Sequence, residues 1–292
     1  MNFFRPNINS SDPSNSRSAN RPITRRSAVK ALGTAAATAI IAPTALSLAG
    51  CGGRLPRGGH PTDYYVSPYD WNGLVENGQR LDFYENGTLR SRWGIDVSEH
   101  QFDINWPAVA TAGVEFAFIR IGNRGATEGR LGVDDYFLQN AIGAAEQGIA
   151  VSGYFFSQAL NEQEVAEEVA FTLEQVAQAE KMGCSFEAIA YDHERVNVEG
   201  ARANDISGEQ LTRNAAAFCD EMLMAGYNTL IYGNKRDLLR LEYNTLTSYP
   251  IWFAEYDVNE PTAPFDFVIW QYTNSGAIPG ISTRVDLNMW LV

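Results

Sequence analysis

The chain has 292 residues and a formal net charge of −13. Residues 1–51 hold six of the 22 Lys/Arg residues and one of the 35 Asp/Glu residues, which leaves a net charge of −18 on the remainder. A body this acidic is not expected to bind nucleic acid or anionic lipid through charge attraction. Its apolar content of 45% is ordinary for a globular protein, and its length allows one large domain or two small ones.

The first fifty residues have the composition of an export signal. Residues 1–30 are polar, rich in Asn, Ser and Arg, and predicted to be disordered. An apolar segment at 31–50 follows two arginines at 25–26. A transmembrane helix has this length, but the low hydrophobicity, Pro43 and the basic front favour a cleavable signal peptide.

Two short motifs in this region resemble known export signals. Residues 24–30 resemble the twin-arginine motif, except that Ala28 stands where Phe is usual, so the twin-arginine and general routes both stay open. Residues 48–51 (Leu-Ala-Gly-Cys) resemble the lipobox of bacterial lipoproteins. That resemblance implies lipidation of Cys51 and anchoring to the outer face of the cytoplasmic membrane. An ordinary signal peptide with a chance cysteine is the alternative.

Two segments separate this signal from the main domain. Residues 51–61 are rich in Gly, Pro and Arg, which is typical of a flexible linker. Residues 62–92 carry four Tyr residues and Trp71, with Asn86-Gly87 as a turn signal. Aromatic side chains favour burial, so we expect this arm to pack against the main domain.

The remaining residues, 93–292, alternate between short apolar strands and amphipathic helices, which indicates an α/β fold. Strands are predicted at 93–97, 115–121, 149–156, 186–192, 228–232, 250–255, 266–271 and 284–287. Helices are predicted at 105–112, 134–147, 161–182 and 208–225. Four strand–helix units followed by strands with little helix between them predict a TIM-like barrel whose second half is irregular.

The sequence Ile189-Ala-Tyr-Asp-His-Glu194 ends one predicted strand with two acids. Side chains alternate along a strand, so Asp192 and Glu194 should point the same way with their Cα atoms about 6.5–7 Å apart. His193 should point the opposite way and pack against the helices. Mutual repulsion and partial burial raise the pKa of such a pair, and this keeps a carboxylic acid protonated for general-acid catalysis. A solvated acidic strand end is the alternative interpretation.

Other polar and aromatic residues fall at the C-terminal ends of the predicted strands, where barrel enzymes place their reacting groups. They are Asp96, Tyr154, Tyr232, Trp252, Tyr256, Gln271, Tyr272 and Asp286. Carboxylates cleave glycosidic bonds and aromatic faces stack on sugar rings. The pattern therefore predicts a carbohydrate site.

Seven segments, in order, resemble glycoside hydrolase family 25, the lysozyme-type muramidases. They are Gly94-Ile-Asp-Val-Ser-Glu-His-Gln101 with Trp106, Phe116-Ala-Phe-Ile-Arg120, Gly153-Tyr-Phe155, Asp192-His-Glu194, Tyr249-Pro-Ile-Trp-Phe-Ala254, Trp270-Gln-Tyr272 and Val285-Asp-Leu-Asn288. The run Phe102-Asp-Ile-Asn-Trp106 departs from the family's Gly-x-Ile-Asp-Trp, and His193 replaces a more usual Val, Trp or Ile. The resemblance implies an irregular (β/α)5β3 barrel over residues 93–292.

The resemblance also implies hydrolysis of the β-1,4 bond after N-acetylmuramic acid in peptidoglycan. Glu194 would be the general acid, with Asp96, Asp192 and Asp286 as the other active-site carboxylates. Tyr154, Tyr232, Trp252 and Gln271 would line the sugar cleft, and Tyr256 and Tyr272 flank the same strand ends. Retention of configuration is expected, with either a protein carboxylate or the substrate's 2-acetamido group as nucleophile.

No cofactor is expected, and no ligand spacing indicates a metal site. We expect a monomer whose partners are glycan strands and, through the lipid, a membrane. Two other functions stay open: a different glycosidase such as a chitinase-like enzyme, and a non-catalytic wall-binding lipoprotein. Cys184 and Cys219 are either buried free thiols or a disulfide formed after export. His100 is interpreted as a structural hydrogen-bonding residue near the first strand rather than a cleft residue.

Overall fold

The structure is a computed structural model that describes residues 65–292. The predictions for the signal segment, the lipobox with Cys51 and the linker therefore lie outside the described residues. No described helix is both long and apolar enough to cross a membrane.

The described chain begins with a small antiparallel sheet. A 3-10 turn, η2 (Trp71–Gly73), leads into β1 (Leu74–Asn77), β2 (Arg80–Glu85) and β3 (Thr88–Leu89). Asn86 and Gly87 form the turn between β2 and β3 with φ angles of 51° and 78°, values that Asn and Gly tolerate. The indole of Trp71 stacks on Phe267 at a ring separation of 5.9 Å. Aromatic contacts therefore join this segment to the larger domain.

Eight strands close into a barrel, so the predicted mixed α/β fold with an eight-stranded barrel is confirmed. The strands are β4 (Ser91–Val97), β5 (Phe116–Arg124), β7 (Ala150–Phe156), β8 (Phe186–Asp192), β9 (Thr229–Asn234), β10 (Ile251–Ala254), β11 (Ile269–Gly276) and β12 (Val285–Leu291). Neighbours from β4 through β11 in chain order pair in parallel, whereas β12 pairs antiparallel with both β11 and β4. The last strand thus closes the ring in the reverse direction.

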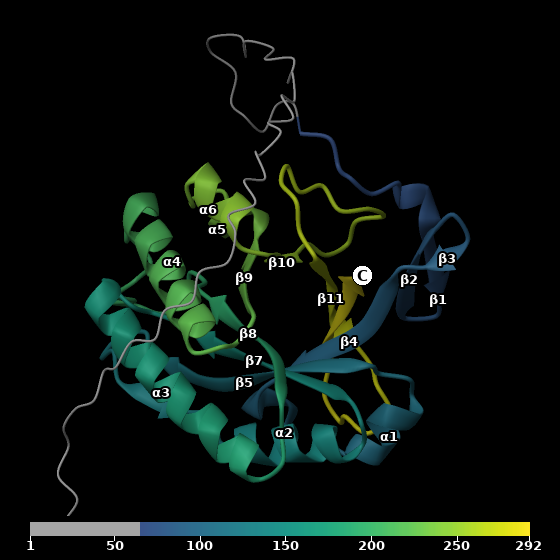
Figure 1. Cartoon of the computed structure of the whole chain (residues 1–292), viewed down its shortest axis with the longest axis horizontal. Helices are drawn as coiled ribbons and strands as arrows, with labels where there is room; N and C mark the ends of the chain where they lie inside the picture. Colours follow the sequence, from purple (N-terminus) through teal and green to yellow (C-terminus); the bar gives the residue numbers. More distant parts are fainter. Residues whose placement is uncertain (1–64) are drawn as a thin grey trace, which may run out of the picture. The chain divides into compact units, whose positions relative to one another are not determined.

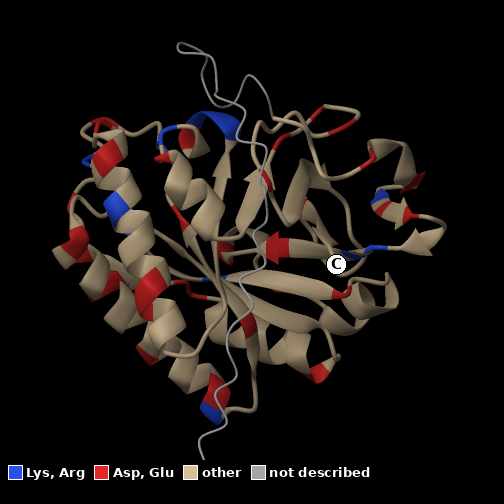
Figure 2. Cartoon of the chain, turned by 45° about the horizontal axis from the view of Figure 1, so that its top comes forward, with Lys and Arg blue, Asp and Glu red and all other residues tan. Residues whose placement is uncertain are grey.

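The helices lie on the outer side of the strands (Figure 1). They are α1 (Trp106–Thr111), α2 (Phe137–Glu146), α3 (Glu162–Lys181), α4 (Gly208–Met224), α5 (Lys235–Leu238) and α6 (Tyr243–Ser248). Asn161 and Ser207 begin α3 and α4 as predicted, because each side chain accepts a hydrogen bond from a backbone N–H of the first turn. Acidic residues outnumber basic ones along these helices and their loops (Figure 2).

Within residues 93–292 the main predicted elements are present, and four short ones were not predicted. These are a 3-10 turn η3 (Glu99–Gln101), strand β6 (Leu131–Val133) and the two helices between β9 and β10. Each has six residues or fewer, too short to show a repeat of apolar residues. Strands β11 and β12 also run beyond their predicted ends. The last residues of β11 pair with the first half of β12 across an irregular register, and the last residues of β12 pair with the starts of β11 and β4.

Two apolar layers hold the barrel together. The inner layer contains Phe116, Phe118, Trp252 and Ile269 inside the ring. The outer layer lies between the strands and the helices, and it includes Cys184 and Cys219 as buried free thiols. Gly94 is required on β4 because a side chain there would lie 2.5 Å from the ring of Phe116. The filled interior leaves only the ends of the barrel for a site.

Candidate active site

A cavity at the C-terminal end of the parallel strands brings four carboxyl groups together. Its inner part has a volume of about 90 Å³ and is lined by Asp96, Asp192, Glu194 and Asp286 with Tyr154, Tyr232, Trp252 and Gln271. It continues into a groove of about 360 Å³ that shares all four acids and adds His100, Gln101 and Arg120. His100 therefore lines the groove, whereas the sequence was interpreted as giving it a structural role near the first strand. Acids from three separate parts of the chain thus meet in one recess.

Asp96 and Asp286 form a pair across two antiparallel strands. They are direct partners in the register of β4 and β12, so both side chains lie on the same side of the sheet. Asp96 also accepts hydrogen bonds of 2.7 Å from the amides of Gln271 and Asn288. Burial, together with the charge and hydrogen bond of Asp96, raises the pKa of Asp286 to about 9. Asp286 therefore holds a proton near neutral pH that it donates toward Asp96.

Asp192 and Glu194 point into the cavity from the end of β8, whereas His193 points away, as the alternation of side chains predicts. His193 is buried, and its Nδ1 lies 3.1 Å from the carbonyl oxygen of Ser157. Burial lowers the pKa of His193 to about 4, so the ring is neutral near neutral pH. This placement agrees with a packing role for His193.

Burial is the main reason that the pKa of Glu194 rises to about 7, followed by the negative charges of Asp237 and Asp96. The sequence predicts that partial burial and the charge of Asp192 both raise this pKa, and of these two causes only burial contributes here. Instead, burial and the charge of Glu194 raise the pKa of Asp192 well above its usual value. The repulsion between the two acids therefore acts on Asp192.

Gln271 connects Asp96 to Tyr232, which lines the cavity, and to Tyr256, which is outside its lining. Its Oε1 accepts hydrogen bonds from the hydroxyls of Tyr232, at 2.8 Å, and Tyr256, at 2.5 Å. With its oxygen held in this way, its Nε2 donates to Asp96. Trp252 is 1% exposed, and its ring lies 4.3 Å from that of Phe118. Trp252 thus forms the floor of the cavity and leaves little of its own face for a sugar.

Tyr272 is not in the cavity, so its prediction as a substrate-binding residue is wrong. It accepts a 2.8 Å hydrogen bond from the indole of Trp93 and donates one of 2.7 Å to the carbonyl of Gln79. Adjacent residues of a strand face opposite sides, and Gln271 faces inward. Tyr272 therefore faces outward and joins the barrel to the turn between β1 and β2.

Three residues that line the groove or act on its acids were not singled out from the sequence. Asn288 lies two residues after Asp286, and the alternation along β12 would have placed both on the inner face. Arg120 lines the groove while bound to Glu99 and Asp134, but it precedes the end of its strand. Asp237 belongs to the short helix α5, which has no detectable pattern. Of these three residues, only Asn288 could have been predicted from the sequence, through its position on β12.

Within residues 65–292, the other recesses do not bring four carboxyl groups together as this cavity does. No cluster of three or more His, Cys, Asp or Glu residues is placed to hold a metal ion within that range. A groove of about 380 Å³ lies at the opposite end of the strands, but its lining is largely apolar, with Leu230, Val268 and Trp290 among it. The carboxyl cavity is therefore the candidate active site.

Known proteins with similar sequences and structures are cell-wall lytic enzymes by name. The chain is 27% identical over 195 residues to the autolytic lysozyme of Clostridium acetobutylicum and 28% identical over 207 residues to lysozyme M1 of Streptomyces globisporus. Each match covers 67% of this chain, but the chain spans only 54% and 66% of those relatives. The modular autolysin LytC from Streptococcus pneumoniae superposes with a TM-score of 0.62 at 25% identity, over 75% of this chain and 52% of that structure.

A family model also matches the part of the chain that contains the cavity. The model for glycosyl hydrolases family 25 matches residues 95–281, more than half of the chain, and this range includes Asp96, Asp192 and Glu194. The resemblance inferred from the seven sequence segments is thereby confirmed. The chain belongs to glycosyl hydrolases family 25.

Proposed function

We propose that the protein is a muramidase that cleaves the β-1,4 bond between N-acetylmuramic acid and N-acetylglucosamine in peptidoglycan. One observation carries the proposal: Glu194, with a pKa raised to about 7, lies in a cavity with three further carboxyl groups. Glycoside hydrolysis requires an acid that is still protonated near neutral pH beside a group that stabilises positive charge at the sugar carbon. Family membership and the names of the relatives support the same substrate.

In this proposal Glu194 is the general acid that protonates the leaving oxygen. Below about pH 7 its carboxyl group holds the proton to be transferred. Glu194 lines both the inner cavity and the open groove, so its carboxyl group is accessible to the glycosidic oxygen of a glycan strand bound in the groove. The burial that raises its pKa also excludes water from the bond being broken.

The acids beside Glu194 in the cavity are assigned the task of stabilising the positive charge that develops at the sugar carbon. Burial raises the pKa values of Asp96, Asp192 and Asp286, but Asp96 accepts hydrogen bonds from two amides, which oppose that rise and favour its ionised form. In the first route, Asp192 accepts a hydrogen bond from the N–H of the substrate's 2-acetamido group. The carbonyl oxygen of that group then attacks the sugar carbon while the bond to the leaving oxygen breaks and Glu194 protonates that oxygen, which gives retention after water opens the resulting ring. Direct attack by the carboxylate of Asp96 is the second route.

The remaining parts of the proposal concern fold class and location. We place the domain in the irregular (β/α)5β3 barrels, supported by five strand–helix units before β10 and a reversed last strand. We also propose export, lipidation at Cys51, and residence on the outer face of the cytoplasmic membrane as a monomer. The motif at residues 48–51 supports that location, because charge attraction to an anionic envelope is not available to so acidic a body.

The test is product analysis after the full-length protein is incubated with purified peptidoglycan. New reducing ends should carry N-acetylmuramic acid, which mass spectrometry of borohydride-reduced products identifies. Reducing ends on N-acetylglucosamine would assign a different glycosidase, and cleavage of chitin alone would assign a chitinase-like enzyme. Binding to walls without new reducing ends would assign a non-catalytic wall-binding protein.

A further inference from the structure

Two adjacent residues after strand β7, Ser157 and Gln158, contact the last residue of β8 and the two residues that follow it. The backbone N–H of Ser157 donates to the carbonyl of Asp192 at 2.7 Å, and the carbonyl of Ser157 lies 3.1 Å from His193 Nδ1. Gln158 Nε2 donates to the carbonyl of Glu194 at 2.9 Å. Both contacting residues are fully buried. The segment 192–194 is therefore held at every residue by one neighbouring loop.

Glu194 depends on this support because little else fixes it. Strand β8 ends at Asp192, and residues 193–207 contain no helix or strand. Within residues 65–292, no hydrogen bond joins the carboxyl group of Glu194 to another group. Its place in the cavity is thus set by its backbone, and a displacement of about 1 Å of a reacting group can cost on the order of 10²-fold in rate.

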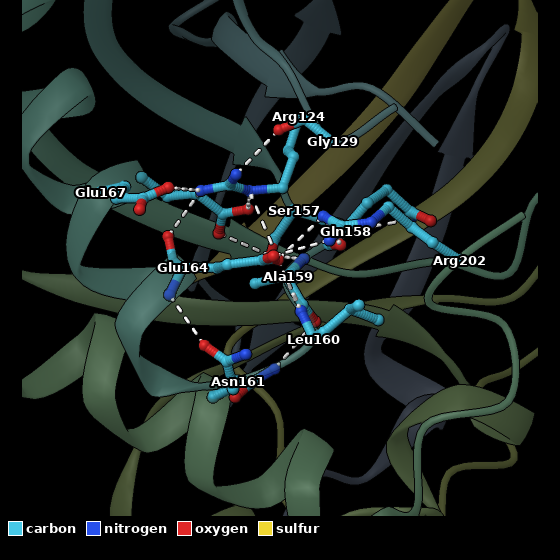
Figure 3. A network of polar contacts seen from close by, with 12 residues as sticks. Arg124, Gly129, Ser157, Gln158, Ala159, Leu160, Asn161, Glu164, Glu167 and Arg202 are labelled. Atoms are coloured by element: carbon cyan, nitrogen blue, oxygen red, sulfur yellow. Dashed lines mark hydrogen bonds and ion pairs between the residues drawn. The ribbon is translucent and has the colours of Figure 1, made fainter. Parts of the chain in front are cut away.

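The loop is itself anchored to a buried polar network (Figure 3). Ser157 Oγ donates to Glu168 Oε2 at 2.7 Å, and Glu168 Oε1 accepts a 2.8 Å bond from Arg124 Nε. Arg124 also donates to the carbonyls of Gly129 and Glu164. The network joins β5, α3 and the loop, so the position of Ser157 is fixed by the frame of the barrel.

The chemistry of the Gln158 side chain suits this task. Its Nε2 carries two hydrogens and uses them on two carbonyls, those of Ser157 at 3.0 Å and Glu194 at 2.9 Å. A carboxylate donates neither bond, a protonated carboxyl group donates one, and a thioether donates none. An amide of this length is therefore the side chain that joins the two backbones.

We propose that Gln158, supported by Ser157 and the Arg124–Glu168 pair, is a positioning residue that fixes the backbone of Glu194 for catalysis. The proposal rests on the role of Glu194 as general acid given above. It assigns a kinetic role to residues that lie outside the cavity lining. Its consequence is that loss of the Gln158 amide should impair turnover without weakening substrate binding.

The experiment compares Gln158→Met and Gln158→Glu with wild type in the full-length protein. Met keeps the length of the side chain and removes both hydrogen bonds, whereas a buried, protonated Glu keeps one. We expect kcat on peptidoglycan to fall by roughly 10–100-fold for Met and by less for Glu, with KM within about twofold of wild type. The apparent pKa of the basic limb of kcat should also move in the Met variant, because the surroundings of Glu194 change.

The matched control is Asn140→Leu. Asn140 is a fully buried amide on α2 that accepts one hydrogen bond from the indole of Trp106, away from the cavity. This variant should lose thermal stability while keeping kcat and the pH profile per folded molecule.

If the Gln158 variants behave like the control, the proposal is overturned. If Gln158→Met does not fold, an unchanged kcat in folded Gln158→Glu overturns it instead. A wild-type protein that releases no reducing ends would refute the muramidase assignment and, with it, the basis of this one.

Discussion

Asp286 lies directly across the antiparallel β4–β12 pair from Asp96, and the two carboxyl groups share a hydrogen bond. Two carboxylates that face each other across one strand pair repel each other too strongly for both to be ionised in a buried site. The proton stays on Asp286, and Asp96 receives three hydrogen bonds in total, from Asp286, Gln271 and Asn288. One strand pairing thus decides which of two neighbouring acids carries charge.

This pairing predicts that Asp286→Asn stabilises the protein more at high pH than at low pH. The pKa of Asp286 is about 9 in the folded state and near 4 when unfolded, so the folded state retains a proton that the unfolded state releases. Stability therefore falls as pH rises from about 4 to 9, and an amide removes that loss. Chemical denaturation should show a gain larger by roughly 1–2 kcal/mol at pH 8 than at pH 4.

The control for this measurement is Asp82→Asn. Asp82 is buried outside the cavity and forms a 2.6 Å ion pair with Arg80, so its replacement should destabilise the protein at pH 8. An Asp286→Asn variant that is destabilised at pH 8, or equally stabilised at both pH values, would contradict the shared-proton pair.

A second prediction concerns Asp237, whose negative charge helps to raise the pKa of Glu194. Asp237→Asn keeps the shape of the side chain, which accepts a 2.9 Å hydrogen bond from Asn234. The general acid must be protonated, so activity falls as pH rises through its pKa. The basic limb of kcat/KM should therefore move to lower pH in Asp237→Asn by up to about one unit.

The comparison variant is Asp192→Asn, because Asp192 is not among the charges that raise the pKa of Glu194. It should lower kcat through the lost contact to substrate and leave the basic limb nearly in place. A larger shift for Asp192→Asn than for Asp237→Asn would show that the charge of Asp192, rather than that of Asp237, sets the pKa of Glu194.

The sequence predicted the barrel and most of its site because both follow the alternation of strand side chains. Asp192, Glu194 and Asp286 each end or begin a strand with a clear apolar pattern, and the structure brings them together. The same alternation places Tyr272 on the outer face of the barrel and Asn288 on the inner face, so the positions of both residues are also contained in the strand pattern.

Other contributions could not be inferred from local patterns. Asp237 reaches the site from a four-residue helix, and Gln158 acts from a loop through a contact 36 positions away in the chain. Such contacts depend on how loops from different strands meet at the end of the barrel. The raised pKa values of Asp192 and Glu194 likewise depend mainly on burial, which the spacing of two acids does not determine.

A third prediction separates Tyr232 from Tyr272 by removing one hydroxyl at a time. Tyr232→Phe removes a hydrogen bond that orients Gln271 toward Asp96, so kcat should fall by about tenfold. Tyr272→Phe removes contacts to Trp93 and Gln79, so it should cost about 1–2 kcal/mol of stability and leave kcat unchanged. Steady-state kinetics with denaturant titrations distinguish the two. A catalytic defect in folded Tyr272→Phe would restore that residue to the site.

A fourth prediction is that Phe102→Gly stabilises the protein. Phe102 has φ of 52° and ψ of −144°, a conformation that is unfavourable for a residue with a Cβ atom, and its side chain is 57% exposed. Removing the strain should raise the free energy of unfolding by about 1 kcal/mol, net of the flexibility that glycine adds. Asn86→Gly is the control, because asparagine tolerates its φ of 51° and little should change. A loss of stability in Phe102→Gly would mean that contacts of the ring outweigh the backbone strain.

The most direct test of the account is the turnover of Glu194→Gln on purified peptidoglycan, measured as released reducing ends per folded molecule. Glutamine keeps the size of the side chain but cannot protonate the leaving oxygen, so kcat should fall by roughly 10²–10⁴-fold. The melting temperature should not fall, and binding to insoluble walls should persist, because the tyrosines and Gln271 that line the cavity are unchanged. A folded Glu194→Gln variant with near wild-type turnover would contradict the assignment of Glu194 as the general acid.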